Sequence, residues 1–156
     1  MAGVIRCLRG VIDTLRSDRG VSAVEFALAA PLLATILTVL VDFGMGFYQK
    51  MQVEDAAQAG AQYALLYGWD SNAIQNAVTN ATPLTGLTAT PVPTQTCGCA
   101  SGTSVTAAVC GSLCANGQSA GTYVTVNAQA TYTPLISYPV MGSTVTLSAQ
   151  SMVRIQ

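Results

Sequence analysis

Histidine is absent from the 156-residue sequence, and charged residues make up only 8% of it. Histidine is the side chain most often used as a general base or zinc ligand near neutral pH, so its absence argues against such a site. The seven acidic residues stand singly except for Glu54 and Asp55, and no charged tract of the kind that binds nucleic acid occurs. We therefore expect no enzyme, no cofactor, no small-molecule substrate and no nucleic-acid partner.

Apolar residues, by contrast, make up 51% of the chain, a proportion that points to a membrane element. No side chain is charged over residues 26–41, and only Thr35 and Thr38 carry a hydroxyl there, which a helix can satisfy on its own carbonyl groups. A helix over residues 21–41 would span roughly 31 Å, about the hydrocarbon thickness of a bilayer. This segment predicts a transmembrane helix with Asp42 at its far interface.

The basic residues are distributed unevenly along the chain. Four of the six lie in the first twenty positions: Arg6, Arg9, Arg16 and Arg19. The positive-inside rule places this end in the cytoplasm and sends the residues after Asp42 to the other side of the membrane. A cleavable secretory signal is the alternative, but no A-x-A-like cleavage site follows the apolar run.

Glu25 stands only one helical turn inside the predicted membrane helix. A carboxylate there costs several kcal/mol unless it is paired, so it predicts a functional role, the alternative being a glutamate that reaches the interface. Gly20 and Val21, followed by Glu25 and Phe26, resemble the type IV prepilin junction, where a prepilin peptidase cuts after the glycine. The resemblance implies cleavage between Gly20 and Val21, and subunit docking by Glu25 and Phe26.

The longer stretch over residues 20–33, which includes Pro31, is similar to the start of TadE-like pseudopilins of the tight-adherence (Tad, or Flp) pilus. The similarity continues through residues 42–44, with Asp42 where the family more often has Glu, and through residues 54–64. Weaker similarities follow at residues 97–99, 123–126, 133–135 and 152–154.

This resemblance implies a minor pilin or pseudopilin that takes part in assembly of a Tad-type pilus. It further implies a bacterial inner-membrane protein with a single span, a cytoplasmic N-terminus and a periplasmic C-terminal domain. The implied partners are the membrane, a prepilin peptidase, a companion pseudopilin, the major pilin and the Tad assembly platform.

The helix is expected to continue outside the membrane to Tyr67, because no proline interrupts it and strong helix formers dominate; Gly68 supplies the stop. Along this part Ala56, Gly60 and Ala64 recur every fourth residue, a spacing that marks a helix-packing face. This small-residue stripe could pack on the protein's own exported sheet or on another subunit, and the sequence leaves both open.

The remaining residues predict a short helix, a loop and two strands. Asp70 or Ser71 can cap a helix over residues 73–78, and the proline-containing stretch 82–96 is typical of an ordered loop or linker. Alternating patterns predict strands over residues 122–132 and 143–155, which should pair antiparallel.

Two further features of this region leave alternatives open. Residues 134–141 between the two strands are unusually apolar, which predicts either a contact surface or a segment that folds back over the sheet.

Four cysteines lie in the exported part, Cys97, Cys99, Cys110 and Cys114, whereas Cys7 lies in the leader. In an oxidising periplasm the four predict two disulfides of undetermined connectivity; a metal site is the rival, although their spacing is not the usual paired CxxC.

The predicted fold class is therefore α+β. It consists of a long N-terminal transmembrane helix that continues outside the membrane, followed by a small disulfide-linked antiparallel β domain. The expected divisions are a cleaved cytoplasmic leader over residues 1–20, the transmembrane and extended helix over 21–68, and the exported β-rich domain over 69–156. Two other functions remain: an uncleaved, signal-anchored accessory protein of a secretion apparatus, and a membrane-tethered periplasmic metal or redox protein.

Overall fold

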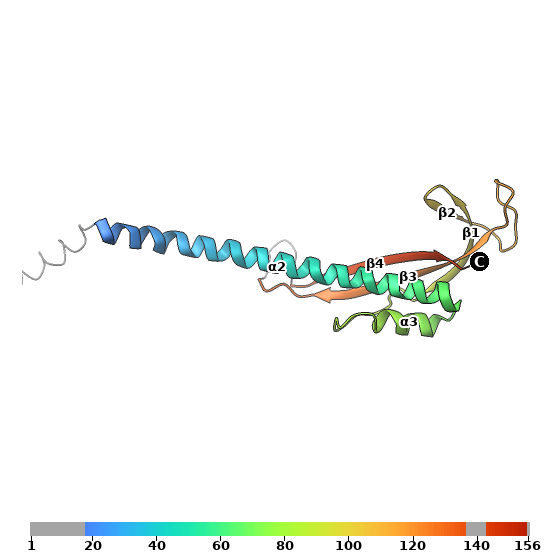
Figure 1. Ribbon diagram of the computed structural model, residues 1–156, viewed down its shortest axis with the longest axis horizontal. Coiled ribbons are helices and arrows are strands. Elements are labelled where there is room, and N and C mark those ends of the chain that lie inside the picture. The colour runs from blue at the N-terminus through green and yellow to red at the C-terminus, as the bar shows by residue number, and fades with distance from the viewer. Residues whose placement is uncertain (1–17, 137–142, 156) are drawn as a thin grey trace, which may run out of the picture. The chain divides into compact units, whose positions relative to one another are not determined.

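The computed structural model describes residues 18–136 and 143–155 and confirms the α+β class. Its elements, in chain order, are α2 (Asp18–Tyr67), α3 (Ser71–Thr79), β1 (Thr94–Ser101), β2 (Ser104–Ala107), β3 (Gly121–Tyr132) and β4 (Val145–Arg154) (Figure 1). The chain divides into two compact units, one that ends at Phe43 and one that begins at Gly44. The boundary therefore falls inside α2, before the second half of the helix.

Residues 21–41 of α2, in the first unit, are exposed on every side of the helix. Only Ala30 is partly buried among them, although nearly all of these side chains are apolar. The Thr35 hydroxyl donates to the Pro31 carbonyl and the Thr38 hydroxyl to the Ala34 carbonyl, both at 2.8 Å. These bonds confirm that the helix satisfies its own hydroxyls. A helix that is apolar all round, and that no other described part of the chain covers, suits a hydrocarbon solvent.

The second unit contains a four-stranded antiparallel sheet in the order β2-β1-β3-β4. Strand β4 pairs over its whole length with β3, from Tyr123 opposite Arg154 to Tyr132 opposite Val145. This pairing confirms the predicted antiparallel hairpin. Alternate residues of β4, beginning at Val145, are partly buried, and the residues between them are exposed. The period-2 pattern of the sequence thus gave the correct faces.

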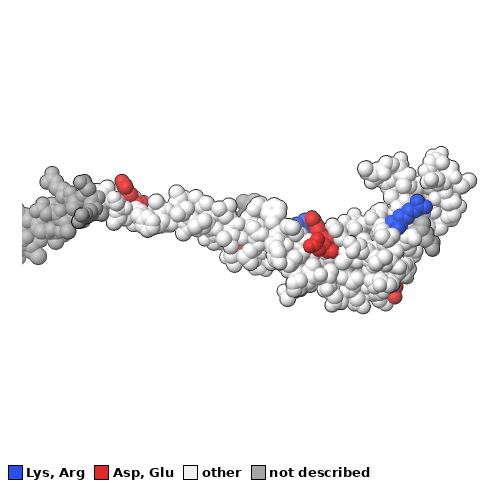
Figure 2. Space-filling view, in the orientation of Figure 1, with Lys and Arg blue, Asp and Glu red and all other residues white. Residues whose placement is uncertain are grey.

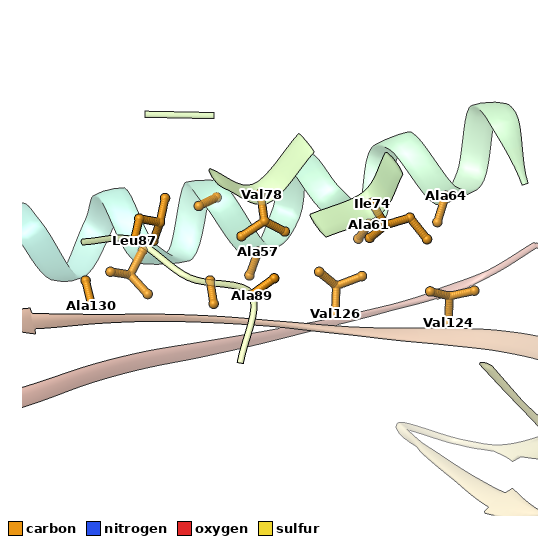
Figure 3. Packing of buried hydrophobic residues seen from close by; sticks show 13 residues of the cluster. Ala57, Ala61, Ala64, Ile74, Val78, Leu87, Ala89, Val124, Val126 and Ala130 are labelled. Carbon is orange, nitrogen blue, oxygen red and sulfur yellow. The ribbon is translucent and has the colours of Figure 1, made fainter. Parts of the chain in front are cut away.

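The core of this unit lies between one face of the sheet and the helices, with α3 and residues 44–67 of α2 on that side (Figures 1 and 3). Its buried members come from α2, α3, the loop after α3, and β3. They are Val53, Ala56, Ala57, Ala61, Ala64, Ile74, Val78, Leu87, Ala89, Val124, Val126, Ala128 and Ala130. Small side chains predominate on α2 and β3, so the two backbones approach closely, and the larger aliphatic groups come mainly from α3 and the loop.

The connection from α2 to α3 follows the predicted signals. Gly68 has a φ of 83°, the left-handed conformation that glycine adopts most readily, and its amide donates to the Ala64 carbonyl at 2.9 Å. Asp70 is the N-cap of α3, and its carboxylate accepts from the amides of Asn72 and Ala73 at 3.0 and 3.1 Å. Both expectations for this corner are confirmed.

Strands β1 and β2 were not predicted, and the loop before them is more than a linker. Within residues 82–96, Leu87 and Ala89 are buried, and Thr88 exchanges two backbone hydrogen bonds of 2.8 Å with Gln129 of β3. The same stretch overlaps the start of β1. The second unit also takes in residues 44–67, which the sequence division had grouped with the membrane helix.

Candidate functional site

The expected cleavage junction lies within α2. Gly20 and Val21 both belong to the helix, which is described from Asp18 onward. Glycine lowers helix stability by about 1 kcal/mol relative to alanine, so the helix is locally weak at this bond. The rest of the leader over residues 1–17, including Cys7, lies outside the described residues.

The expected docking residues Glu25 and Phe26 are exposed on α2, with 71% of the Phe26 side chain accessible. No ion pair involving Glu25 occurs among the described residues. The single chain therefore presents this carboxylate outward in the midst of an apolar helix surface. The docking role of Glu25 stays a prediction, because docking requires a second subunit and the structure describes one chain.

Asp42, whose expected place at the far interface of the membrane stays a prediction, is only 2% exposed within the chain. It is the one charged side chain that is buried among the described residues. Buried carboxylates are retained only with hydrogen-bonding partners, so Asp42 has a structural role that its position at the end of the apolar run did not reveal.

The small-residue stripe packs within the second unit. Ala56 and Ala64 are fully buried, and Figure 3 shows Ala64 within the core. Gly60 lies against α3 and β3. A Cβ at Gly60 would lie 2.6 Å from Val78 Cγ2 and 2.8 Å from Val126 Cγ1, closer than real Cβ contacts. The alternative that the stripe packs on another subunit is therefore wrong, because the protein's own sheet and helix already cover it.

The four cysteines of the second unit form two disulfides, Cys97–Cys110 and Cys99–Cys114. Both join β1 to the loop that precedes β3. The sequence predicted two bonds but left three connectivities open. Since both bonds consume all four thiols, the metal-site alternative loses its ligands, and no cluster of three or more potential ligands occurs elsewhere in the described part of the chain.

The surface of the second unit is nearly free of charge. No charged residue occurs between Asp70 and Arg154, and the visible face in Figure 2 carries few charged groups. A polar hollow of about 320 Å³ lies on the sheet, lined by Thr90, Pro91, Asn127, Gln129, Ser148, Ala149 and Gln150. Two of its amides are engaged, because Gln150 Nε2 donates to Asn127 Oδ1 and Asn127 Nδ2 donates to the Pro91 carbonyl. The lining offers no acidic or basic group for proton transfer.

These features define a small disulfide-bonded α+β protein whose N-terminal helix is long and apolar enough to cross a membrane. The family model described as TadE-like protein matches residues 20–62. This match supports a TadE-like protein of the Tad pilus system and confirms the resemblance over the junction, the apolar run and most of the small-residue stripe. Comparison with curated proteins and with solved structures gives no match.

Proposed function

We propose that this protein is a membrane-anchored pseudopilin or minor pilin that takes part in assembly of a Tad-type pilus and is processed after Gly20 by a prepilin peptidase. The match to the TadE-like family over residues 20–62 carries the proposal, because it begins at the glycine of the junction and runs through the apolar helix. The exposed apolar surface of α2 over residues 21–41 supports the membrane anchor.

Cleavage would change the electrostatics of the helix start. The cut removes the arginine-rich leader and creates an α-amino group on Val21, one helical turn from Glu25. In a medium of low dielectric constant a paired carboxylate is far more stable than a lone one. Glu25 of one subunit would therefore pair with the new amino group, either its own or that of a neighbour during docking.

The proposed orientation has the leader in the cytoplasm of a bacterial cell and the second unit in the periplasm. Arginines before the apolar run support the first half of this statement. The two disulfides support the second half, since such bonds persist in oxidising compartments. In this location the major pilin, a companion pseudopilin and the Tad assembly platform are the proposed partners.

The protein is proposed to work through contacts rather than catalysis. The hollow on its sheet lacks an acid or base, and the four cysteines of the second unit are bonded to one another. An uncleaved accessory protein of a secretion apparatus is the remaining rival, and processing at Gly20 distinguishes it from a pseudopilin.

The test compares two variants in the native host by immunoblotting for precursor size and by measuring pilus output. Gly20→Leu should block processing, because a branched side chain crowds the peptidase subsite, and should abolish piliation. Glu25→Gln should be processed normally yet assemble poorly. Glu54→Gln, which changes an exposed glutamate of α2 outside the apolar run, is the matched control and should behave like the wild type. Normal piliation by Glu25→Gln would contradict the docking role, and normal piliation by unprocessed Gly20→Leu would contradict the pseudopilin assignment.

A further inference from the structure

Several apolar side chains of the second unit are exposed at the end where α2 enters it. On α2 these are Met45, Phe47 and Tyr48, which are 44%, 57% and 63% exposed. Beyond the end of β3, Leu135 is 63% exposed. We call these four residues the apolar collar. None of them belongs to the core of the unit.

The turn end of the β3–β4 hairpin is attached to this same part of α2. A Cβ at Gly46 would lie 3.3 Å from Tyr132 Cε1, so the last residue of β3 lies directly against the helix. One turn further along, the Lys50 ammonium donates to the Ser148 carbonyl of β4 at 2.7 Å. These two attachments hold the hairpin end at the level of Gly46 to Lys50.

The collar begins immediately after the apolar run in the chain. The interfacial region of a bilayer adds roughly 5–7 Å beyond the hydrocarbon on each side, which corresponds to about four or five residues of a helix. If the hydrocarbon ends near Val41, Met45 and Gly46 therefore lie among the headgroups. Because Tyr132 packs at Gly46, the chain that leaves β3 reaches the same depth.

From this geometry we propose that the apolar collar docks on the lipid surface, so that Leu135, just beyond β3, inserts into the headgroup region. The inference rests on the proposed membrane anchor and adds a second point of contact with the bilayer. It would keep the sheet from pivoting about α2 and hold the second unit close to the membrane.

The contact is apolar rather than electrostatic. Lys50, the basic residue nearest the collar in the chain, already pairs with Glu54 at 2.9 Å and bonds the Ser148 carbonyl. No other basic residue occurs between Arg19 and Arg154. Docking should therefore occur on neutral phosphatidylcholine and should not require anionic lipid.

Tryptophan fluorescence in the full-length protein, reconstituted in phosphatidylcholine vesicles with brominated acyl chains, tests this proposal. The single tryptophan is first removed by Trp69→Phe. In that background Leu135→Trp and Met45→Trp are the reporters, and Leu37→Trp marks the apolar run. Leu66→Trp, 74% exposed at the other end of α2, is the matched control.

We expect quenching to be strongest for Leu37→Trp, intermediate for the two reporters and absent for Leu66→Trp, with the Leu135→Trp signal quenched several-fold more than the control. Quenching at Leu37→Trp without quenching at Leu135→Trp would overturn the docking proposal while leaving the anchor intact. Absence of quenching at Leu37→Trp would overturn the membrane anchor itself.

Discussion

The two halves of α2 differ in what surrounds them. Residues 21–41 are exposed on every side and almost entirely apolar, whereas residues 44–67 bury one stripe and expose the rest. The buried stripe consists mainly of alanine and glycine, and the exposed positions after Met51 include Glu54 and Asp55. One continuous helix therefore carries two different surfaces, one suited to lipid and one suited to a sheet.

This difference shows that large apolar side chains and small side chains indicate different neighbours of a helix. Among the described residues nothing buries the large apolar side chains of the first half, which suits a helix surrounded by lipid. The small side chains of the second half contact β3 and α3 closely, as Gly60 does with Val78 and Val126. A charge introduced into the first half should consequently weaken membrane insertion, whereas a charge introduced into the second half should destabilise the second unit.

The largest expected effect comes from placing an aspartate in each half. Ala57→Asp buries a charge in a position that is 1% exposed, at a penalty of several kcal/mol, comparable with the total stability of a small domain. The second unit should unfold while membrane insertion persists. Leu37→Asp should leave this unit folded and weaken insertion by about 3 kcal/mol.

Urea unfolding, monitored by Trp69 fluorescence, measures the stability of the second unit. Carbonate extraction of membranes measures insertion. If both variants lost both properties, the division of α2 into two functional halves would be wrong.

Loss of a disulfide should have the next largest effect. Replacing Cys99 and Cys114 together by serine opens a loop closed across 15 residues, which predicts a loss of about 3 kcal/mol from the second unit. Insertion of the first half should not change. Urea unfolding of the oxidised protein measures the loss, and Cys7→Ser is the control. An unchanged midpoint for the double variant would mean that the bond does not constrain this unit.

Alanine at two glycines of α2 should change stability in opposite directions. Gly60→Ala forces a methyl group against Val78 and Val126 and should destabilise the second unit by about 1–3 kcal/mol. A Cβ at Gly44 meets nothing within 4 Å, so Gly44→Ala should stabilise the helix by about 0.5–1 kcal/mol. Thermal melting of the two variants side by side gives the sign of each change. Destabilisation of equal size at both positions would remove the packing argument.

The smallest effects concern hydrogen bonds in the two regions. Asp70→Ala leaves two amides at the start of α3 without their acceptor and should cost about 1 kcal/mol. Thr35→Val removes a hydroxyl that bonds only the carbonyl of its own helix, so it should change stability by less than about 0.5 kcal/mol. Thermal melting measures the stability of both variants, and carbonate extraction measures their membrane insertion. An effect of Thr35→Val larger than that of Asp70→Ala would indicate a partner outside the chain.

Local signals in the sequence predicted much of this fold. The uncharged run, the glycine stop at Gly68, the Asp70 cap and the alternation of β3 and β4 each depend on neighbouring residues, and each is confirmed. Strands β1 and β2 escaped prediction because their side chains are small and mostly exposed on both faces, so they lack a period-2 pattern. Their positions depend on pairing with β3 and on disulfides between distant residues.

The site was less predictable than the fold. Spacing identified the small-residue stripe but not its partner, because Gly60 contacts Val126, far away in the chain. Burial of Asp42 had no local signal either, since its sequence neighbours are typical of an interface. The expected cleavage between Gly20 and Val21 came only from family resemblance, and the docking roles of Glu25 and Phe26 stay predictions.

The most direct test of the account is the intact mass and N-terminal sequence of the protein extracted from membranes of its native host. A processed pseudopilin predicts a chain that begins at Val21 and retains both disulfides. Recovery of the full precursor, with its arginine-rich leader still attached in cells that carry pili, would contradict the account and favour an uncleaved accessory protein.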